Sequence, residues 1–214
     1  MLPVNSNALD TFKRAEAYVM SLGFRTEIDF QQSRHVEQTS ESDFLSESAW
    51  VVLCSGFRER IVRKMFSHLS LCFCDWESAS AILKREHLCR STALELFAYP
   101  AKIDAILSIA RTVAARGYQN YQEWFRSDPT VRLQELPFIG PITACHLAKN
   151  LGFDVAKPDR HLQRLAIALG FADAHQLCGA VSVATGRPKA LIDSILWRYC
   201  EQLGTHMLAP PNNE

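Results

Sequence analysis

The sequence predicts an all-α protein. Apolar residues recur at three- and four-residue spacing through most of the 214 residues, which is the pattern of helices that bury one face. Strict alternation of apolar and polar residues, the pattern of a half-buried strand, is confined to residues 24–30. The connections are short and contain turn residues, as in Ser127–Asp128–Pro129, which suits compact helical packing.

The periodicity places the helices in order along the chain. We expect them at residues 8–22, 44–55, 58–70, 76–84, 102–116, 141–151, 160–169 and 187–203. In the third of these segments, Ile61, Met65 and Leu69 form one apolar stripe. Residues 24–30 are expected to be extended, and the Ser-, Thr- and Glu-rich residues 37–48 to form a loop and the start of a helix.

The composition is that of an ordinary globular protein, with 48% hydrophobic and 21% charged residues, 9 Gly and 9 Pro. These values exclude collagen-like, disordered and low-complexity classes. The sequence has no apolar run of the length that spans a membrane, and charged residues such as Lys13 and Arg14 interrupt the region where a signal peptide would need an apolar stretch. We therefore expect no membrane association and a location in a bacterial-type cytosol or nucleoid, or in a nucleus.

The cysteines do not form a recognisable metal or disulfide pattern. There are seven, at Cys54, Cys72, Cys74, Cys89, Cys145, Cys178 and Cys200. Because the number is odd and no Cys-x-x-Cys pair occurs, we expect reduced and mostly buried thiols. The spacings of zinc fingers, iron–sulfur proteins, His-Glu-x-x-His enzymes and glycine-rich phosphate loops are missing, so we expect no metal and no other cofactor.

The net charge of zero is unevenly distributed. Residues 1–49 carry four Lys/Arg and eight Asp/Glu, whereas residues 50–170 carry sixteen and eleven, a net charge of +5. Residues 171–214 carry three and four. A cationic middle segment permits phosphate binding, although the solvated faces of helices would give the same count.

Residues 133–153 read LQELPFIGPITACHLAKNLGF and predict a helix–hairpin–helix. A short helix ends near Glu135, and a second begins with Pro141, whose missing N–H is not needed at that position. The turn leaves the amides around residues 139–143 unpaired at a helix N-terminus, where the helix dipole favours an anion. Such a turn can hold a DNA phosphate without a lysine, although any αα-hairpin can also contain Pro and Gly.

A second motif, KPDRHLQRLAIALG, places Asp159 nineteen residues after Gly140. Together the two motifs resemble the helix–hairpin–helix (HhH-GPD) DNA glycosylase superfamily, which contains endonuclease-III-like and adenine-mismatch glycosylases. The matching residues are Leu136, Pro137, Gly140, Thr143 and Ala144 in the hairpin and Asp159, His161 and Arg164 in the later loop. More weakly, residues 49–65 and 192–200 resemble an early and a late helix of the family, so that the resemblance covers about residues 45–203.

The resemblance implies that Asp159 is catalytic. Breaking an N-glycosidic bond builds positive charge on the sugar, which a carboxylate stabilises, and the same group can orient or deprotonate the attacking water. The alternative is that Asp159 only caps the helix beginning at Arg160, and the two roles are compatible. By resemblance, His161 and Arg164 support the aspartate loop.

The sequence departs from the family pattern at the hairpin and at the C-terminus. Bifunctional members have a nucleophilic lysine where this chain has Ile142, which implies a monofunctional enzyme unless Lys149 or Lys157 substitutes. Phe138 replaces the first glycine of the hairpin. No cysteine follows Cys200, so the iron–sulfur cluster of many relatives is not expected.

Base flipping assigns further residues, because an enzyme that extrudes a base must fill the gap in the stack and hold the base. By resemblance the loop 54–60 supplies the wedge, either Phe57 or Arg58. The expected DNA-binding residues are Pro137, Phe138, Ile139, Gly140, Ile142 and Thr143 of the hairpin with Phe57, Arg58 and Arg60 of the loop, and Arg63 and Lys64 as further phosphate ligands. Trp50, Tyr99, Trp124 and Phe125 are candidates for a base pocket, although aromatic residues at helical spacing often belong to the core.

The resemblance implies a two-lobed fold with the hairpin at the cleft between the lobes. We expect residues 1–47 to pack with the C-terminal lobe, 48–150 to form a helical lobe, and 151–214 to form the C-terminal lobe with the Asp159 loop. The expected protein is a monomeric, monofunctional glycosylase acting on double-stranded DNA, with the excised base left open. Two alternatives are a DNA-binding protein that has lost catalysis and a helical adaptor that uses its acidic N-terminal segment.

Overall fold

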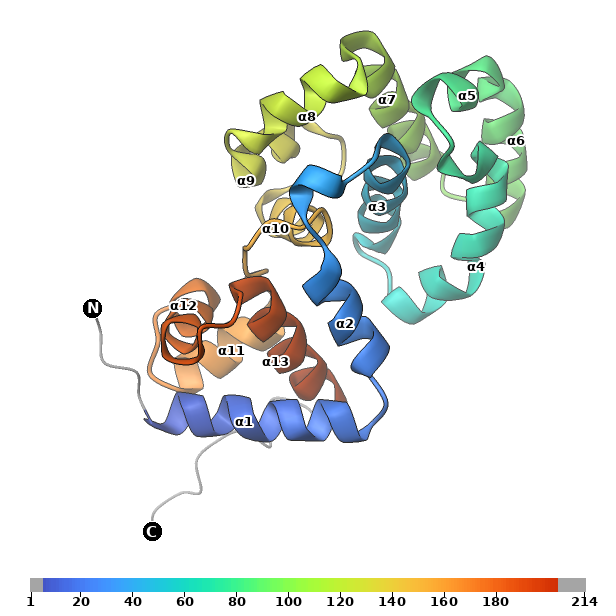
Figure 1. The fold of residues 1–214 in the computed structure, drawn as a ribbon. Helices are drawn as coiled ribbons and strands as arrows, with labels where there is room; N and C mark the ends of the chain where they lie inside the picture. The colour runs from blue at the N-terminus through green and yellow to red at the C-terminus, as the bar shows by residue number, and fades with distance from the viewer. Residues whose placement is uncertain (1–5, 204–214) are drawn as a thin grey trace. The chain divides into compact units, whose positions relative to one another are not determined.

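The computed structural model describes residues 6–203, and all of their regular structure is helical (Figure 1). The all-α class is therefore confirmed. Every segment that was expected to be helical contains a helix, and the ends differ by three residues or fewer. The structure adds helices at 86–96, 118–126, 129–132 and 174–185, which the periodicity did not single out. Helix α6, for example, buries only the small residues Cys89 and Ala93.

The described chain divides into two compact units. The middle unit contains residues 36–151, and the terminal unit combines residues 6–35 with 152–203. The first boundary lies after His35 and not, as expected, after Glu47. The reason is that helix α3 (Glu41–Cys54) runs through the expected boundary and packs within the middle unit.

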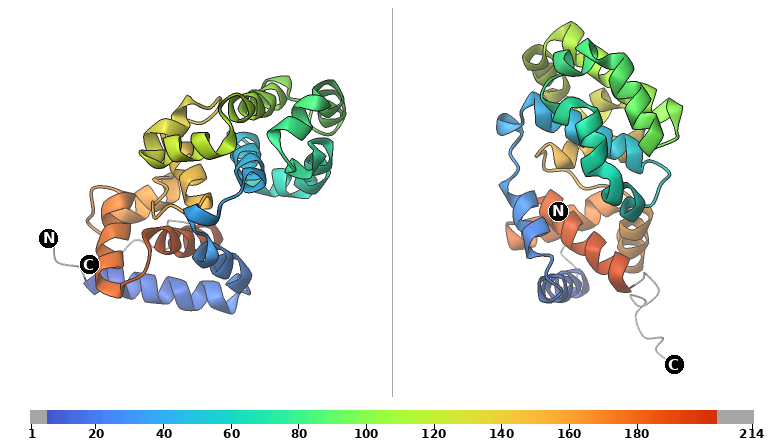
Figure 2. Two further views of the ribbon diagram at one scale, coloured as in Figure 1. Left: turned by 45° about the horizontal axis from the view of Figure 1, so that its top comes forward. Right: turned by 90° about the vertical axis from the view of Figure 1, so that its right-hand side faces the viewer.

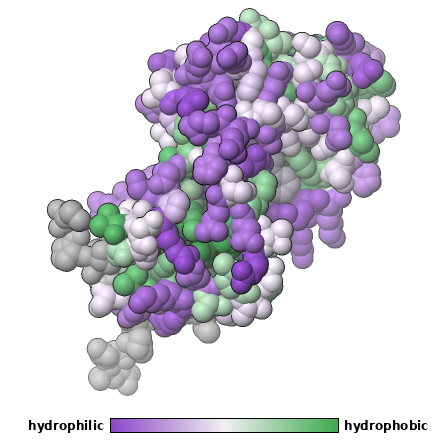
Figure 3. All heavy atoms as spheres, viewed as in Figure 1, coloured by the Kyte–Doolittle hydropathy of each residue, from purple (hydrophilic) through white to green (hydrophobic). Residues whose placement is uncertain are grey.

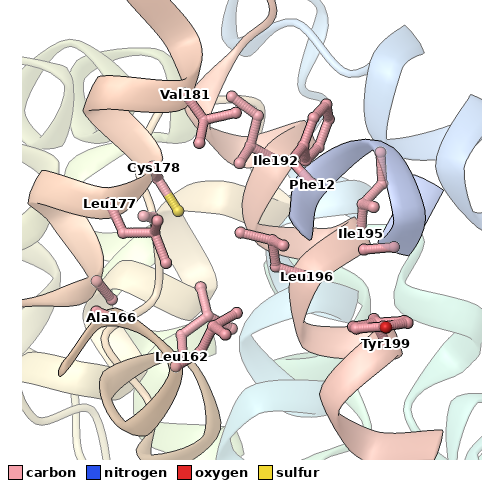
Figure 4. Close-up of a cluster of buried hydrophobic side chains, with 14 of the residues drawn as sticks. Phe12, Leu162, Ala166, Leu177, Cys178, Val181, Ile192, Ile195, Leu196 and Tyr199 are labelled. Carbon is pink, nitrogen blue, oxygen red and sulfur yellow. The ribbon is translucent and has the colours of Figure 1, made fainter. Parts of the chain in front are cut away.

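The terminal unit is built from five helices. They are α1 (Ser6–Ser21), α2 (Arg25–Ser33), α11 (Arg160–Ala168), α12 (Ala174–Thr185) and α13 (Lys189–Leu203). Helices α1, α2, α11 and α12 all pack against α13, as Figures 1 and 2 show for α1 and α2. Figure 4 shows the shared core, in which Phe12 of α1, Leu162 of α11 and Leu196 of α13 are almost fully buried. The core thus joins segments from both ends of the chain.

Residues 24–30 form most of helix α2, so the expected extended segment is wrong. Phe24 and Ile28 are four residues apart and therefore lie on the same face of a helix, and both pack against the core of the terminal unit. Phe30 is 51% exposed, which shows that the alternating pattern does not define a buried face. No partner strand exists among residues 6–203.

A buried arginine joins α2 to α13. The guanidinium of Arg198 donates to Glu27 of α2 at 2.6 Å and to Glu201 of its own helix at 2.7 Å. It also lies 4.6 Å from the ring centroid of Phe24 and 4.8 Å from that of Trp197. Because buried charges need partners, this arrangement explains how α13 accommodates a buried guanidinium.

The middle unit contains the remaining elements. They are η1 (Val36–Gln38), α3, α4 (Glu59–Cys72), η2 (Cys74–Trp76), α5 (Ala79–Lys84), α6 (Glu86–Leu96), α7 (Pro100–Arg116), α8 (Tyr118–Arg126), α9 (Pro129–Arg132), η3 (Leu133–Glu135) and α10 (Pro141–Asn150). Helix α3 packs against α4, α7 and α10. It begins with a capping box, in which the Ser40 hydroxyl accepts from the Asp43 amide and the Asp43 carboxylate accepts from the Ser40 amide. The helix start expected within 37–48 is thus at Glu41.

Hydrophilic side chains cover much of the face drawn in Figure 3. None of the helices formed by residues 6–203 combines the length and the apolar character needed to cross a lipid bilayer.

The core of the terminal unit provides a test of the fold. Leu196→Ala removes a fully buried side chain and should lower the free energy of unfolding by about 2–5 kcal/mol. Ile167→Ala is the matched control, because this α11 side chain is 62% exposed and its removal should change stability by less than about 0.5 kcal/mol. Urea denaturation followed by circular dichroism measures both; equal effects would contradict the packing of α13.

Candidate functional site

The hairpin has the expected geometry, with η3, a turn over residues 136–140, and α10 beginning at Pro141. The turn is closed by an Ile139 amide that donates to the Leu136 carbonyl at 3.2 Å. Its end is fixed by Thr143, whose hydroxyl accepts from the Gly140 amide at 2.7 Å and donates to the Gly140 carbonyl at 3.1 Å. The threonine of the motif therefore has a structural role as the side-chain partner of the turn.

Fewer hairpin amides are free than the sequence predicted. Those of Ile139 and Gly140 are used within the turn, and Pro141 has none. Among the described residues, the amides of Ile142 and Thr143 have no carbonyl partner. Because they lie in the first turn of a ten-residue helix, both can donate to one anion.

Phe138 adopts a backbone conformation that favours glycine. Its φ is +63°, in the left-handed region, which costs a residue with a Cβ about 1–2 kcal/mol. In the motif that the hairpin resembles, the first glycine stands at this position, and the Phe138 backbone has a conformation that suits glycine. The Phe138 ring centroid lies 5.2 Å from the ammonium of Lys102, a contact that offsets part of this strain.

Lys102 connects three segments of the middle unit, and the sequence analysis missed it. Its side chain is 2% exposed. The ammonium donates to the carbonyls of Val52, Leu53 and Ser55 at the end of α3, where helix carbonyls lack backbone partners. The sequence signal for this role was the four-residue spacing between Lys102 and Ile106, which puts both on one face of the helix. Ile106 is buried, so a lysine on that face is buried too and needs acceptors.

Burial lowers the pKa of Lys102 from 10.5 to about 8. The charged form is retained at neutral pH because the ammonium donates hydrogen bonds to three carbonyls and lies next to aromatic faces. The chain therefore holds a buried cation next to the hairpin.

Three aromatic rings surround Lys102, and we call them the aromatic platform: Phe57, Tyr99 and Phe138. The ring centroids of Phe57 and Tyr99 lie 5.1 Å and 6.0 Å from the ammonium, and 5.7 Å from each other. The buried Phe97 supports the Phe57 ring at 5.2 Å. The platform residues are 36–43% exposed, so the structure brings the expected wedge residue and a hairpin residue together on one accessible surface.

The basic side chains near this surface differ in availability. Arg58 and Arg60 are exposed and have no acidic partner among residues 6–203. Arg63 pairs with Glu59 and lies 5.3 Å from the ring centroid of Trp50. Arg58 and Arg60 are therefore more available to bind an anion than Arg63.

The expected base-pocket residues do not come together. Among the ring contacts of the described residues, Trp50 contacts Phe66, and Trp124 contacts Tyr121. Tyr99 belongs to the aromatic platform. Phe125 is fully buried and stacks on Phe44 in the core, so its assignment to a pocket is wrong.

In the terminal unit, Asp159 caps helix α11. Its Oδ1 accepts from the backbone amides of His161 at 2.9 Å and Leu162 at 3.1 Å. Its Oδ2 lies 4.0 Å from Nζ of Lys157, and the Asp159 side chain remains 13% exposed. The carboxylate is thus held in place through one oxygen, while the other faces a single cation and retains access to solvent.

The loop that carries Asp159 is anchored to α13 by two carboxylates, Asp154 and Asp193, and the sequence analysis missed both. Oδ1 of the buried Asp193 accepts from the Lys157 amide at 2.8 Å. Oδ1 of Asp154 accepts from the Ala190 amide at 3.0 Å. These bonds fix both ends of the segment that precedes Asp159.

The expected supporting residues act differently from the prediction. His161 holds Asp159 through its backbone amide, while its ring Nδ1 is buried without a partner. Arg164 is exposed, and no contact joins it to Asp159. Of the two lysines considered as substitutes for the hairpin amine, Lys149 is buried in the middle unit, whereas Lys157 adjoins Asp159.

The thiol of Cys200 lies near Asp159. Burial, and secondarily the charge of Asp159, raise the pKa of Cys200 to about 12, so this cysteine remains a neutral thiol at physiological pH. Among the residues described by the structure, no group of three or more His, Cys, Asp or Glu side chains is arranged to hold a metal ion.

Comparison of the chain with protein-family models, curated proteins and solved structures finds no match. The resemblance to the glycosylases therefore depends on the two motifs.

Replacing Lys102 tests its role as the partner of three carbonyls. Lys102→Met keeps a similar volume but leaves buried carbonyls of α3 without a donor, and should lower the free energy of unfolding by about 1–3 kcal/mol. The control Lys84→Met changes an exposed lysine in the same unit and should have no measurable effect. Urea titrations of the wild type and the two variants measure these free energies of unfolding. If Lys102→Met is as stable as the wild type, Lys102 does not have this role.

The lowered pKa of Lys102 predicts a pH dependence of stability. Between pH 8 and 10.5 the folded state has released this proton while the unfolded state still holds it, so the Lys102 contribution makes stability rise with pH. The slope is at most about 1.4 kcal/mol per pH unit. The difference in free energy of unfolding between wild type and Lys102→Met should therefore increase from pH 8 to 10, and a flat difference would contradict the shift.

Proposed function

We propose that this protein is a monofunctional DNA glycosylase, which flips a damaged, mismatched or modified base from double-stranded DNA and hydrolyses its N-glycosidic bond to leave an abasic site. The observation that carries the proposal is the state of Asp159. Its carboxylate is fixed by two amides yet keeps one oxygen free of hydrogen-bonding amides. Such a group can stabilise the positively charged sugar and orient water.

The hairpin and its surroundings support the DNA-binding part of the proposal. The free amides of Ile142 and Thr143 are suited to one backbone phosphate, and the exposed Arg58 and Arg60 to others. Phe57 is the better candidate for the wedge, because it is an exposed apolar ring at the end of a loop whose backbone Lys102 holds. Arg58 then contacts the adjacent phosphate.

The finer architecture is part of the same proposal. In the two-lobed HhH-GPD arrangement the hairpin lies at the cleft between the lobes, and DNA binds across it as a substrate of a monomeric enzyme. The proposal requires Asp159 of the terminal unit and the hairpin of the middle unit to face the same stretch of DNA. Ile142 in place of the lysine supports hydrolysis by water without a Schiff base.

A catalytically inactive helix–hairpin–helix DNA-binding protein is the alternative. It is favoured by the complete capping role of Asp159, which would explain the residue without chemistry. This protein would bind duplex DNA with a strong dependence on salt and would release no base.

The variant Asp159→Asn separates the two roles, because asparagine also caps helices but lacks the charge. We expect base release to fall by at least about tenfold with unchanged folding. Asp173→Asn is the matched control, since Asp173 caps α12 in the same unit through an equivalent bond to the Gln176 amide. Abasic sites are measured by heat–alkali cleavage of duplexes carrying alkylated, deaminated, oxidised, mismatched or hypermodified bases.

Loss of release in Asp159→Asn but not in Asp173→Asn would establish the catalytic role and identify the base. If the two variants lose the same amount of activity, Asp159 acts through folding alone. Salt-sensitive binding of every duplex without base release would favour the inactive DNA-binding protein.

A further inference from the structure

The aromatic platform has a combination of properties that duplex docking by the hairpin does not require. Three rings from different segments, Phe57, Tyr99 and Phe138, remain 36–43% exposed around one buried ammonium. The contact between the Phe57 and Tyr99 rings is edge-on, with an interplanar angle of 88°. The exposed fractions of Phe57 and Tyr99, 36% and 43%, leave part of each side chain available to a flat ligand.

The chemistry of the platform selects planar aromatic ligands. Exposed aromatic faces on nucleic-acid-binding proteins stack on unpaired bases, which all present a π-face, whereas paired bases in a duplex are already stacked on their neighbours. The rings are also held in place, since Lys102 bonds to the Ser55 carbonyl two residues before Phe57, and its ammonium contacts the rings of Tyr99 and Phe138. A rigid platform loses little conformational freedom when a base stacks on it.

Phosphate ligands lie next to two of the three rings. Phe138 belongs to the turn that presents the free amides of Ile142 and Thr143, and Phe57 is followed directly by the exposed Arg58. Stacking rings beside backbone donors and an unpaired cation are the two components that single-stranded nucleic acid needs, because its bases and phosphates are exposed together.

We propose that the aromatic platform is a binding site for unpaired nucleobases, so that the preferred DNA substrate contains a single-stranded or bubble region next to the target base. DNA with an unpaired region is thus the substrate class of the proposed glycosylase, and the choice of DNA as the partner rests on that proposed function. Stacking on the platform and base release at Asp159 are separate events with separate readouts.

The test compares two fluorescent oligonucleotides of equal charge, using the full-length protein and fluorescence anisotropy at one salt concentration. One is oligo-thymidine of about 12 nucleotides, and the other has the same length but an abasic analogue at every position, so that it has phosphates and no bases. The protein should bind oligo-thymidine at least about fivefold more tightly than the abasic strand, a difference that corresponds to the stacking of a single base.

Phe57→Leu and Tyr99→Leu remove ring faces and retain apolar volume, and each should reduce the ratio by which the protein prefers oligo-thymidine to the abasic strand. Leu88→Ala is the control, because Leu88 is an exposed apolar residue of α6 outside the platform. Circular dichroism and a thermal melt confirm that each variant is folded.

Equal affinity of the wild type for the two strands, or no affinity for either, overturns the inference. A preference that Phe57→Leu and Tyr99→Leu retain also overturns it, because the bases would then stack elsewhere. The proposed function is tested separately by heat–alkali cleavage. Base release without a preference for oligo-thymidine would support the glycosylase and contradict the platform. A preference for oligo-thymidine without base release would support the platform and contradict the glycosylase.

Discussion

The buried ammonium of Lys102 is the constraint on which the middle unit depends. A lysine charge cannot remain in an apolar interior without acceptors, and here the end of α3 supplies three carbonyls that need donors. Meeting both needs at one atom brings the start of α7 to the end of α3. The loop that carries Phe57 and the hairpin turn that carries Phe138 then contact the same cation. The exposed rings that are proposed to bind DNA are thus positioned by the same buried ammonium that pairs with the carbonyls of α3.

The same interaction explains how the turn accommodates Phe138, at the position where the glycosylase motif that the sequence resembles has a glycine. A phenylalanine with a φ of +63° is unfavourable on backbone grounds alone, and a glycine would relieve that strain. The contact between the Phe138 ring and the ammonium compensates for it, and the side chain adds an exposed aromatic face that glycine lacks. The substitution is therefore compatible with the turn and changes what the turn presents to a ligand.

In the terminal unit, the helix cap and the proposed chemistry depend on the same carboxylate. Two amides orient Asp159 through Oδ1, and the buried Asp193 holds the preceding residues against α13. The rigidity that a capping role requires is also what a catalytic carboxylate needs, since a group fixed before the reaction does not have to reorganise during it. A single residue type at the start of a helix can therefore serve both purposes.

The sequence by itself determined the features that depend on neighbouring residues. Helical periodicity predicted the all-α class, Pro141 after Gly140 predicted the hairpin, and Asp159 before Arg160 predicted the cap, because helices, turns and caps arise from contacts within a few residues. Local pattern failed at residues 24–30, where the spacing of Phe24 and Ile28 also fits a helix. Only the tertiary structure decided that Phe57, Tyr99 and Phe138 meet at Lys102, because residues some forty positions apart come together through the packing of α3, α7 and α10, which no local pattern encodes.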